Sequence, residues 1–116
     1  MTSVFPHQPN VEYSPRDRAD LTVSGDSQVD ALNALSSGTA QSIVGALDGD
    51  PKPISEIAER VDTSIQNVHH HLRRLEENDL VEPVDTRYSV KGREMTVYAL
   101  AAKKLVVEFG AAKQSQ

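Results

Sequence analysis

The chain of 116 residues contains no cysteine and no tryptophan, and aromatic residues make up only 4% of it. Without cysteine, a disulfide framework, a thiolate zinc site and a cysteine nucleophile are all excluded. Because aromatic residues are scarce, a core has to be built from Ala, Val, Ile and Leu, which a chain this short stabilises only marginally. We therefore expect a second subunit to contribute stability.

Long apolar runs are also missing from the sequence. No run approaches the roughly 18 residues that a membrane span needs, and the N-terminus lacks the basic-then-apolar layout of a signal peptide. The length suits one domain with short tails. These features predict a soluble, cytoplasmic protein without a membrane partner.

Basic residues are outnumbered, with 12 Lys and Arg against 17 Asp and Glu and a net charge of −5. DNA-binding domains are often strongly basic, so this average by itself argues against DNA. The acidic excess lies in residues 1–62, which hold four basic and ten acidic residues, whereas residues 63–116 hold eight and seven. The local positive clusters of the second half fit either an ordinary solvated surface or a DNA contact.

The N-terminal segment differs in composition from the rest of the chain. Three of the six prolines lie within the first 15 residues, in a polar stretch with little periodicity. We therefore predict a disordered or loosely docked tail over 1–26, one domain over 27–110 and a flexible C-terminal tail over 111–116.

Apolar residues recur at helical spacing in four segments of the predicted domain. They predict helices at about 28–35, 40–47, 55–60 and 64–78. Ser36 or Ser37 can cap the second helix, and Thr63 with Gln66 matches a capping box at the start of the fourth. Only three residues separate the third and fourth helices, so these two form a compact pair.

The segments that follow are rich in β-branched and aromatic residues. Residues 81–89 and 95–100 flank Lys91-Gly92 and predict a β-hairpin. Residues 101–109 return to Ala, Leu and Val with paired lysines. Leu105, Val106 and Phe109 suit one face of a helix, which we favour, although Val106-Val107 would also suit a strand.

The fourth helix is amphipathic in an unusual way. Ile65, Val68, Leu72 and Leu75 share one side and are predicted to pack inward. The opposite side carries hydrogen-bond donors and no carboxylate before Glu76. Arg pairs with guanine and Asn or Gln with adenine in the major groove, so this side is equipped to contact bases, unless it is a solvated face that happens to lack acids. The candidate DNA-contacting residues are Ser64, Gln66, Asn67, His70, Arg73 and Arg74.

Three further cations, Arg87, Lys91 and Arg93, surround the predicted hairpin tip. Such flexible cations contact phosphates or the minor groove and supply affinity more than sequence choice, unless the hairpin is simply solvated. Two helices joined by a tight turn and followed by a hairpin with a basic tip form a winged helix-turn-helix. The expected fold class is therefore mainly α with a β-hairpin wing (α+β).

The helical pair and hairpin resemble the ArsR-type winged-helix transcriptional regulators, and look most like the small archaeal members. The matching residues are Ile57-Ala58-Glu59-Arg60-Val61, Ser64, Val68, His71-Leu72, Leu75, Leu80-Val81, Gly92-Arg93 and Val97-Tyr98, and the resemblance covers about 28–100. It implies a homodimer that binds a pseudo-palindromic operator and is built on the first and last helices. The implied interface residues are Val29, Leu32, Leu35, Leu105, Val106 and Phe109. Asp62 stands where the family commonly has glycine, and Asp tolerates a left-handed backbone.

Metal sensing by that family is not implied here, because residues 54–61 offer no Cys or His. His69, His70 and His71 point about 100° apart on a helix and cannot converge on one ion. We expect His70 to face DNA and the other two to flank the core. For His71, a phosphate contact and a semi-buried structural role are both open. No metal or cofactor is predicted, and the sequence leaves any effector unknown.

Together these features predict a sequence-specific, homodimeric regulator of transcription whose partner is double-stranded DNA. The helix at 64–78 would enter the major groove, and the wing at 87–93 would contact the backbone or minor groove. The alternative is a winged-helix protein-interaction module of the transcription machinery without DNA readout, for which the net acidic charge would be the relevant feature. An enzyme is not expected, since no catalytic constellation or phosphate-binding loop stands out.

Overall fold

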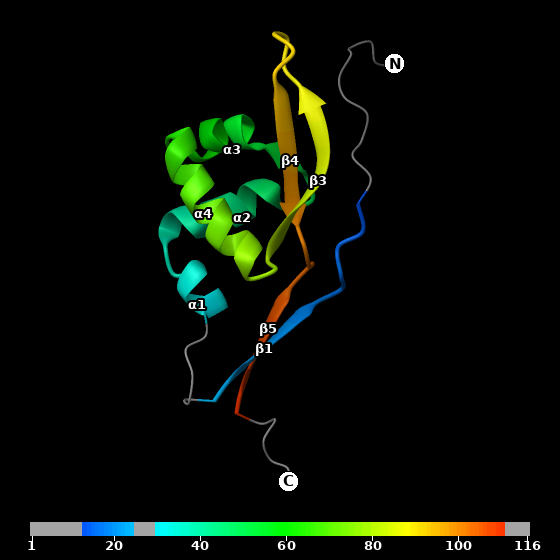
Figure 1. Ribbon diagram of the computed structural model, residues 1–116. Coiled ribbons are helices and arrows are strands. Elements are labelled where there is room, and N and C mark those ends of the chain that lie inside the picture. The colour runs from blue at the N-terminus through cyan, green and yellow to red at the C-terminus, as the bar shows by residue number, and fades with distance from the viewer. Residues whose placement is uncertain (1–12, 25–29, 111–116) are drawn as a thin grey trace.

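The computed structural model describes residues 13–24 and 30–110 (Figure 1). The expected N-terminal tail residues 1–12, the predicted interface residue Val29 and the expected C-terminal tail at 111–116 lie outside these ranges. The elements in chain order are β1 (Ala19–Val23), α1 (Asp30–Ala34), α2 (Gly38–Leu47), β2 (Lys52–Pro53), α3 (Ile54–Val61), α4 (Ile65–Glu77), β3 (Val81–Tyr88), β4 (Glu94–Leu100) and β5 (Leu105–Phe109).

The helices α1 to α4 pack together on one side of the β3–β4 hairpin (Figure 1). Their apolar sides meet in one core, in which Ile43 and Leu47 of α2, Ile57 of α3 and Leu75 of α4 are fully buried. Burial of such aliphatic side chains is the main stabilising contribution available to a chain this poor in aromatics. The fold class is the predicted one, mainly α with a β-hairpin wing.

The hairpin belongs to a three-stranded antiparallel sheet in the order β2–β4–β3. On β4, Tyr98 and Leu100 pack against the helical core, and Val97 and Ala99, which alternate with them, are buried as well. Both faces of this part of the strand are therefore at least partly covered. The strands extend beyond the helices and join in a turn in which Gly92 adopts a φ of 77°. That projecting end is the wing.

The start of α4 differs from the predicted capping box by one residue. Ser64, not Thr63, is the N-cap, and its Oγ accepts a hydrogen bond from the Asn67 N–H at 3.0 Å. Asp62 takes the left-handed conformation after α3, and Ser64 is then the residue with the extended backbone that a cap needs. The Thr63 hydroxyl instead accepts from the Asn67 side chain at 3.0 Å.

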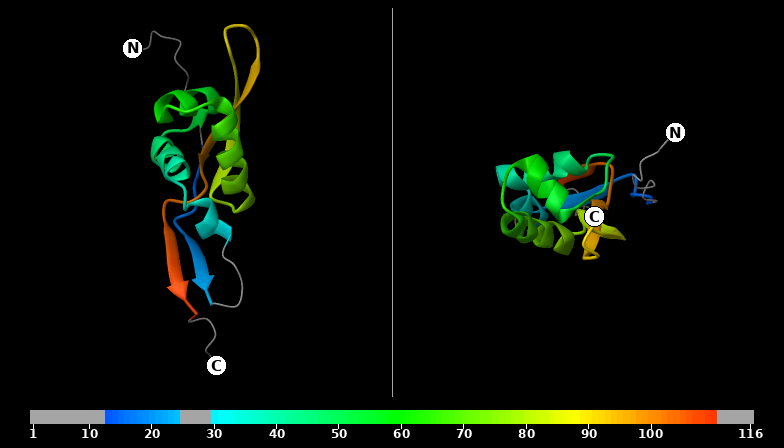
Figure 2. Two further views of the ribbon diagram at one scale, coloured as in Figure 1. Left: turned by 90° about the vertical axis from the view of Figure 1, so that its left-hand side faces the viewer. Right: turned by 90° about the horizontal axis from the view of Figure 1, so that it is seen from above.

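Two predictions for the ends of the domain are wrong. Residues 19–23 of the expected tail form strand β1, and residues 105–109 of the expected last helix form strand β5. The two strands pair in parallel from Ala19 with Leu105 to Val23 with Phe109 and lie side by side below the helices (Figures 1 and 2). The β-branched pair in β5 suits a strand, and this preference prevails because a partner strand is present.

Candidate nucleic-acid interface

The angle between α3 and α4 is set by the short turn that joins them. Asp62 has φ 63° and ψ 52°, and its N–H donates to the Glu59 carbonyl at 3.3 Å. The following Thr63 N–H donates to the Ala58 carbonyl at 3.1 Å. This pattern ends α3 with a left-handed residue and lets α4 begin almost at once. The pair therefore has the helix-turn-helix geometry predicted from the spacing.

The inward side of α4 anchors the helix firmly. Val68, Leu72 and Leu75 are buried to 2% exposure or less. On the other side Gln66, His70 and Arg73 are exposed, and Arg74 is half-buried. Within residues 13–24 and 30–110, none of these four side chains forms a hydrogen bond or an ion pair. The donor-lined side is thus neither covered by the hairpin nor used in holding the fold together.

Two of the predicted base-contacting residues have a structural task instead. The Ser64 hydroxyl accepts from the Asn67 N–H, and the Asn67 amide nitrogen donates to Thr63 Oγ1. These bonds satisfy groups at the helix start that would otherwise lack partners. The structure therefore separates Ser64 and Asn67, which build the turn, from Gln66, His70 and Arg73, which project from it.

The three consecutive histidines lie in different surroundings. His70 is exposed, as expected, and its ring stands edge-on to that of His71 with 5.0 Å between centroids. His71 is half-buried, and its Nδ1 atom has no hydrogen-bond partner among the described residues. Burial lowers the pKa of His71, and the nearby charges of His70 and Arg74 lower it further. His69 does not flank the core as predicted but is exposed.

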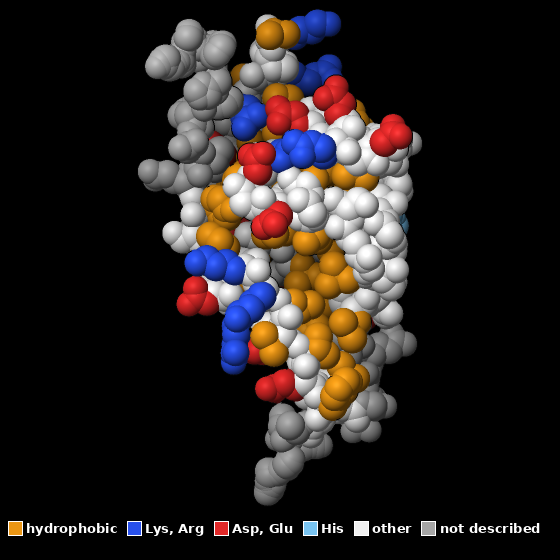
Figure 3. Space-filling view, turned by 180° about the vertical axis from the view of Figure 1, so that it is seen from behind, with side chains coloured by type: hydrophobic (Ala, Val, Ile, Leu, Met, Phe, Trp, Pro, Cys, Tyr) orange, Lys and Arg blue, Asp and Glu red, His pale blue; other side chains and the backbone are white. Residues whose placement is uncertain are grey.

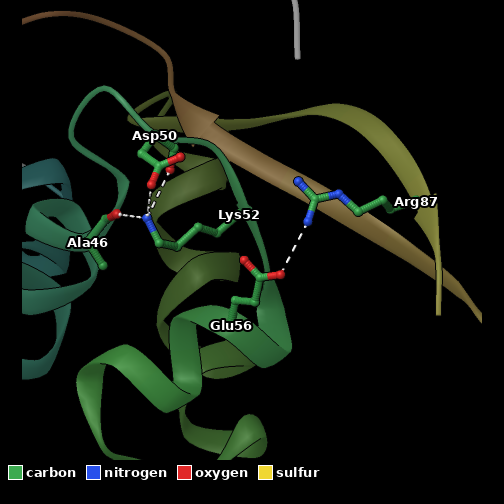
Figure 4. Close-up of polar contacts among 5 residues, drawn as sticks. All are labelled: Ala46, Asp50, Lys52, Glu56 and Arg87. Atoms are coloured by element: carbon green, nitrogen blue, oxygen red, sulfur yellow. Dashed lines mark hydrogen bonds and ion pairs between the residues drawn. The ribbon is translucent and has the colours of Figure 1, made fainter. Parts of the chain in front are cut away.

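The wing presents fewer free cations than the sequence indicates. Lys91 and Arg93 are exposed at the tip, where Ser89 Oγ accepts from their backbone N–H groups at 3.2 and 3.0 Å. Arg87 lies further down β3, and its Nη1 is 3.2 Å from Glu56 Oε2 of α3 (Figure 4). Its guanidinium is therefore held against the helices and does not extend from the tip.

A cleft of about 380 Å³ separates the first turns of α3 and α4 from strand β4. Ile65 opens into it and is 53% exposed, which corrects the prediction that it packs inward. Ile65 is the first residue of α4, so the apolar side of the helix begins before the helix reaches the core. In the sequence, only its position next to the N-cap indicates that this residue is exposed. The other lining residues are Pro53, Ile54, Ser55, His69, Arg93, Glu94, Met95, Thr96 and Tyr98.

The described residues predicted for dimerisation lie in or next to α1 and in β5, two elements at the other end of the molecule from the wing (Figure 1). Phe109 is 82% exposed and Leu32 is 37% exposed, whereas Leu35, Leu105 and Val106 are half-buried. Because residues 105–109 are a strand, an interface between first and last helices is not available.

The described residues hold neither a membrane-spanning helix nor a cluster of metal ligands. No helix in the described ranges is long and apolar enough to cross a membrane. Residues 13–24 and 30–110 contain no group of three or more His, Cys, Asp and Glu side chains that could hold a metal ion.

Comparison with known proteins supports this architecture. Residues 35–84 match the family model described as a helix-turn-helix domain. A search of curated proteins found no match.

Several solved structures are similar to this chain in fold. One is Mb0332 from Mycobacterium bovis, described as a homodimeric winged helix-turn-helix DNA-binding domain and a possible ArsR-family transcriptional regulator. It is 20% identical with a TM-score of 0.52, over 64% of this chain and 63% of that one. NolR from Sinorhizobium fredii is 20% identical with a TM-score of 0.51, over 63% and 67% of the two chains. Reduced HlyU from Vibrio cholerae is 22% identical with a TM-score of 0.50, over 63% and 70%.

These similarities establish the fold. The chain has a winged helix-turn-helix fold, and the resemblance predicted from the sequence is confirmed at the level of the fold. The three solved structures named above come from bacteria, and the likeness to archaeal members stays a prediction.

Proposed function

We propose that this winged helix-turn-helix protein is a sequence-specific DNA-binding regulator of transcription that acts as a homodimer on a pseudo-palindromic operator. The observation that carries the proposal is the exposed donor side of α4, which has no carboxylate before Glu76 and on which Gln66, His70 and Arg73 are unengaged within the described residues. A helix held by its apolar side and offering donors on the other can enter a major groove and pair with base edges.

The wing supplies a second contact in this proposal. Lys91 and Arg93 at the exposed tip neutralise phosphates or enter the minor groove beside the site read by α4. Such contacts raise affinity for every sequence alike. The basic residues of the wing and α4 therefore supply local positive charge on a chain whose net charge is −5.

The cleft between α4 and β4 fits the sugar-phosphate strand that separates the two grooves. Arg93 and His69 line it, and both are exposed. Ile65, which also lines the cleft, offers an apolar contact to a sugar or a thymine methyl group. Sequence reading by α4 and backbone contact by the wing would thus be joined through one continuous surface.

The homodimer belongs to the proposal for two reasons. Mb0332, which shares the fold, is described as homodimeric. One α4 helix contacts only a few base pairs, and a two-fold pair placed one helical turn apart reads a site long enough to be specific.

The salt dependence of DNA binding tests the proposal. Sites would first be selected from a random duplex library and the affinity then measured at increasing salt. If each protomer contacts four to five phosphates, the slope of log affinity against log salt should be about −7 to −9, taking about 0.9 for each phosphate. Failure to bind any duplex at low salt, with capture of protein partners instead, would favour an interaction module and overturn the proposal.

A further inference from the structure

The ribbon formed by β1 and β5 is strongly amphipathic. Because paired residues of a parallel sheet point to the same side, the register places six apolar residues on one face. These residues are Ala19, Leu21, Val23, Leu105, Val107 and Phe109. The other face carries Asp20, Thr22, Val106 and Glu108. The charged side chains of the ribbon therefore all lie on this second face.

That apolar face is incompletely covered by the protein itself. Val107 is 38% exposed and Phe109 is 82% exposed at the free end of the ribbon. Parallel strands are normally buried on both faces, and a two-stranded sheet alone is marginally stable in water. The ribbon therefore gains stability from a cover over this face.

At the base of the ribbon the same surface becomes concave. A groove of about 110 Å³ lies between the ribbon and the helices, and apart from two lysines at its rim it is lined by apolar residues. The lining residues are Ala19, Leu35, Val44, Leu80, Leu100, Ala102, Lys103, Lys104 and Leu105. An engineered apolar cavity of about 150 Å³ admits benzene, so a groove of this size can take part of an aromatic ring.

The groove and the ribbon form one surface. From behind, apolar side chains run as a strip down the lower half of the molecule, where α1 and the ribbon lie (Figure 3). One end of this surface is a projecting ring, Phe109, and the other is a hollow. A surface with a knob at one end and a hole at the other is complementary to a second copy of itself turned by a two-fold rotation.

We infer that the occupant is a second copy of this chain, and that Phe109 of each ribbon inserts into the groove at the base of the partner's ribbon. The inference rests on the proposed homodimer and specifies how it forms. The ribbon thereby takes the place of the helices that the family resemblance implied.

The first test compares Phe109→Glu with Val90→Glu. Val90 is fully exposed at the wing tip, so the control places the same charge on an equally available apolar residue outside the proposed interface. By sedimentation equilibrium the natural chain and V90E should be dimeric and F109E monomeric, with the helical circular dichroism of all three alike. A natural chain that is monomeric at the concentration at which it binds DNA, or an F109E chain that stays dimeric, would overturn the inference.

Cysteine cross-linking tests the pairing without weakening the interface through charge. The chain has no cysteine, so each introduced thiol is unique. Oxidation of a mixture of Phe109→Cys and Lys104→Cys should give a disulfide-linked heterodimer, because Lys104 lies at the groove's rim. A Lys91→Cys chain mixed with Phe109→Cys should not cross-link. Preferential coupling of Phe109→Cys with itself would place the two rings together and contradict insertion into the groove.

DNA binding distinguishes failure of this inference from failure of the proposed function. The monomeric F109E chain should keep weak, salt-dependent binding to a single half-site and lose the tighter binding to a full site. If F109E remains dimeric and binds the full site normally, the ribbon interface is wrong and the regulator stands. If the ribbon variants dissociate but no duplex is bound by any form, the regulator is wrong and the ribbon interface stands.

Discussion

Arg87 of strand β3 and Glu56 of helix α3 form an ion pair, with 3.2 Å between Nη1 and Oε2 (Figure 4). The contact joins the wing to the helix that precedes α4. It also neutralises a cation that the sequence alone assigns to DNA. Because the Arg87 side chain is 25% exposed and that of Glu56 is 51% exposed, the pair adds little to stability, and its main effect is on where the guanidinium points.

Glu56→Gln should therefore strengthen DNA binding. The substitution releases Arg87 to contact a phosphate, so the salt slope should steepen by about 0.9 for each protomer. The matched control is Glu59→Gln, which removes the same charge from an exposed residue of α3 that forms no ion pair within the described residues. Equal slopes for the two variants would show that the ion pair does not restrain Arg87.

Lys52 is the one buried charged residue in the described part of the chain, and it has three hydrogen bonds. Its Nζ donates to the Ala46 carbonyl at 2.7 Å and to the carbonyl and Oδ2 of Asp50 at 3.3 and 2.8 Å (Figure 4). Lys52→Met keeps the apolar stem but leaves the Ala46 carbonyl unpaired, which should cost about 1–3 kcal/mol of unfolding free energy in urea titrations. Lys91→Met, at an exposed site on the wing tip, should cost less than about 0.5 kcal/mol. A similar loss for both would refute a structural role for Lys52.

The lowered pKa of His71 makes stability depend on pH. Because the folded protein binds this proton less readily than the unfolded chain, stability is complete above the unfolded value of 6.5 and falls as the pH drops through the folded pKa. His71→Gln should flatten this decline in unfolding free energy between pH 7.5 and pH 5. His69→Gln, at an exposed site, should leave the decline as it is. An unchanged pH profile in His71→Gln would contradict the assignment.

The left-handed turn at Asp62 should show a preference for glycine. A non-glycine residue in this conformation costs about 1–2 kcal/mol, which Asp bears better than Ala. Asp62→Ala should therefore melt at a lower temperature than Asp62→Gly, by about 4–8 °C for each kcal/mol. Asp79, with φ 60° after α4, should show the same order. Alanine variants as stable as the glycine variants would contradict the role of the backbone conformation.

The central part of the fold follows from local patterns in the sequence. The apolar periodicity of the sequence identifies the buried sides of three helices. These sides carry Ile43 and Leu47 of α2, Ile57 of α3, and Leu72 and Leu75 of α4. These patterns succeed because each helix needs only one apolar stripe and its neighbours in sequence are its neighbours in space. The β3–β4 hairpin was predicted correctly for the same reason, because its two strands are neighbours in sequence.

The missed features depend on contacts between distant parts of the chain. Val106-Val107 is ambiguous between helix and strand until β1 provides a partner, and β1 itself lies in a segment whose prolines suggest disorder. The side of α4 that faces outward was predictable from periodicity, but the engagement of Asn67 with Thr63 and of Arg87 with Glu56 was not. A sequence shows which groups can donate hydrogen bonds, whereas only the fold shows which donors are already used.

Base discrimination by α4 tests the central claim most directly. The affinities of Gln66→Ala and Lys91→Ala would be measured on a selected operator and on a scrambled duplex at one salt concentration. Gln66→Ala should lose about 1–3 kcal/mol on the operator and almost nothing on the scrambled duplex, whereas Lys91→Ala should weaken binding to both alike. If Gln66→Ala weakens both duplexes equally, α4 does not read bases and the claim is wrong.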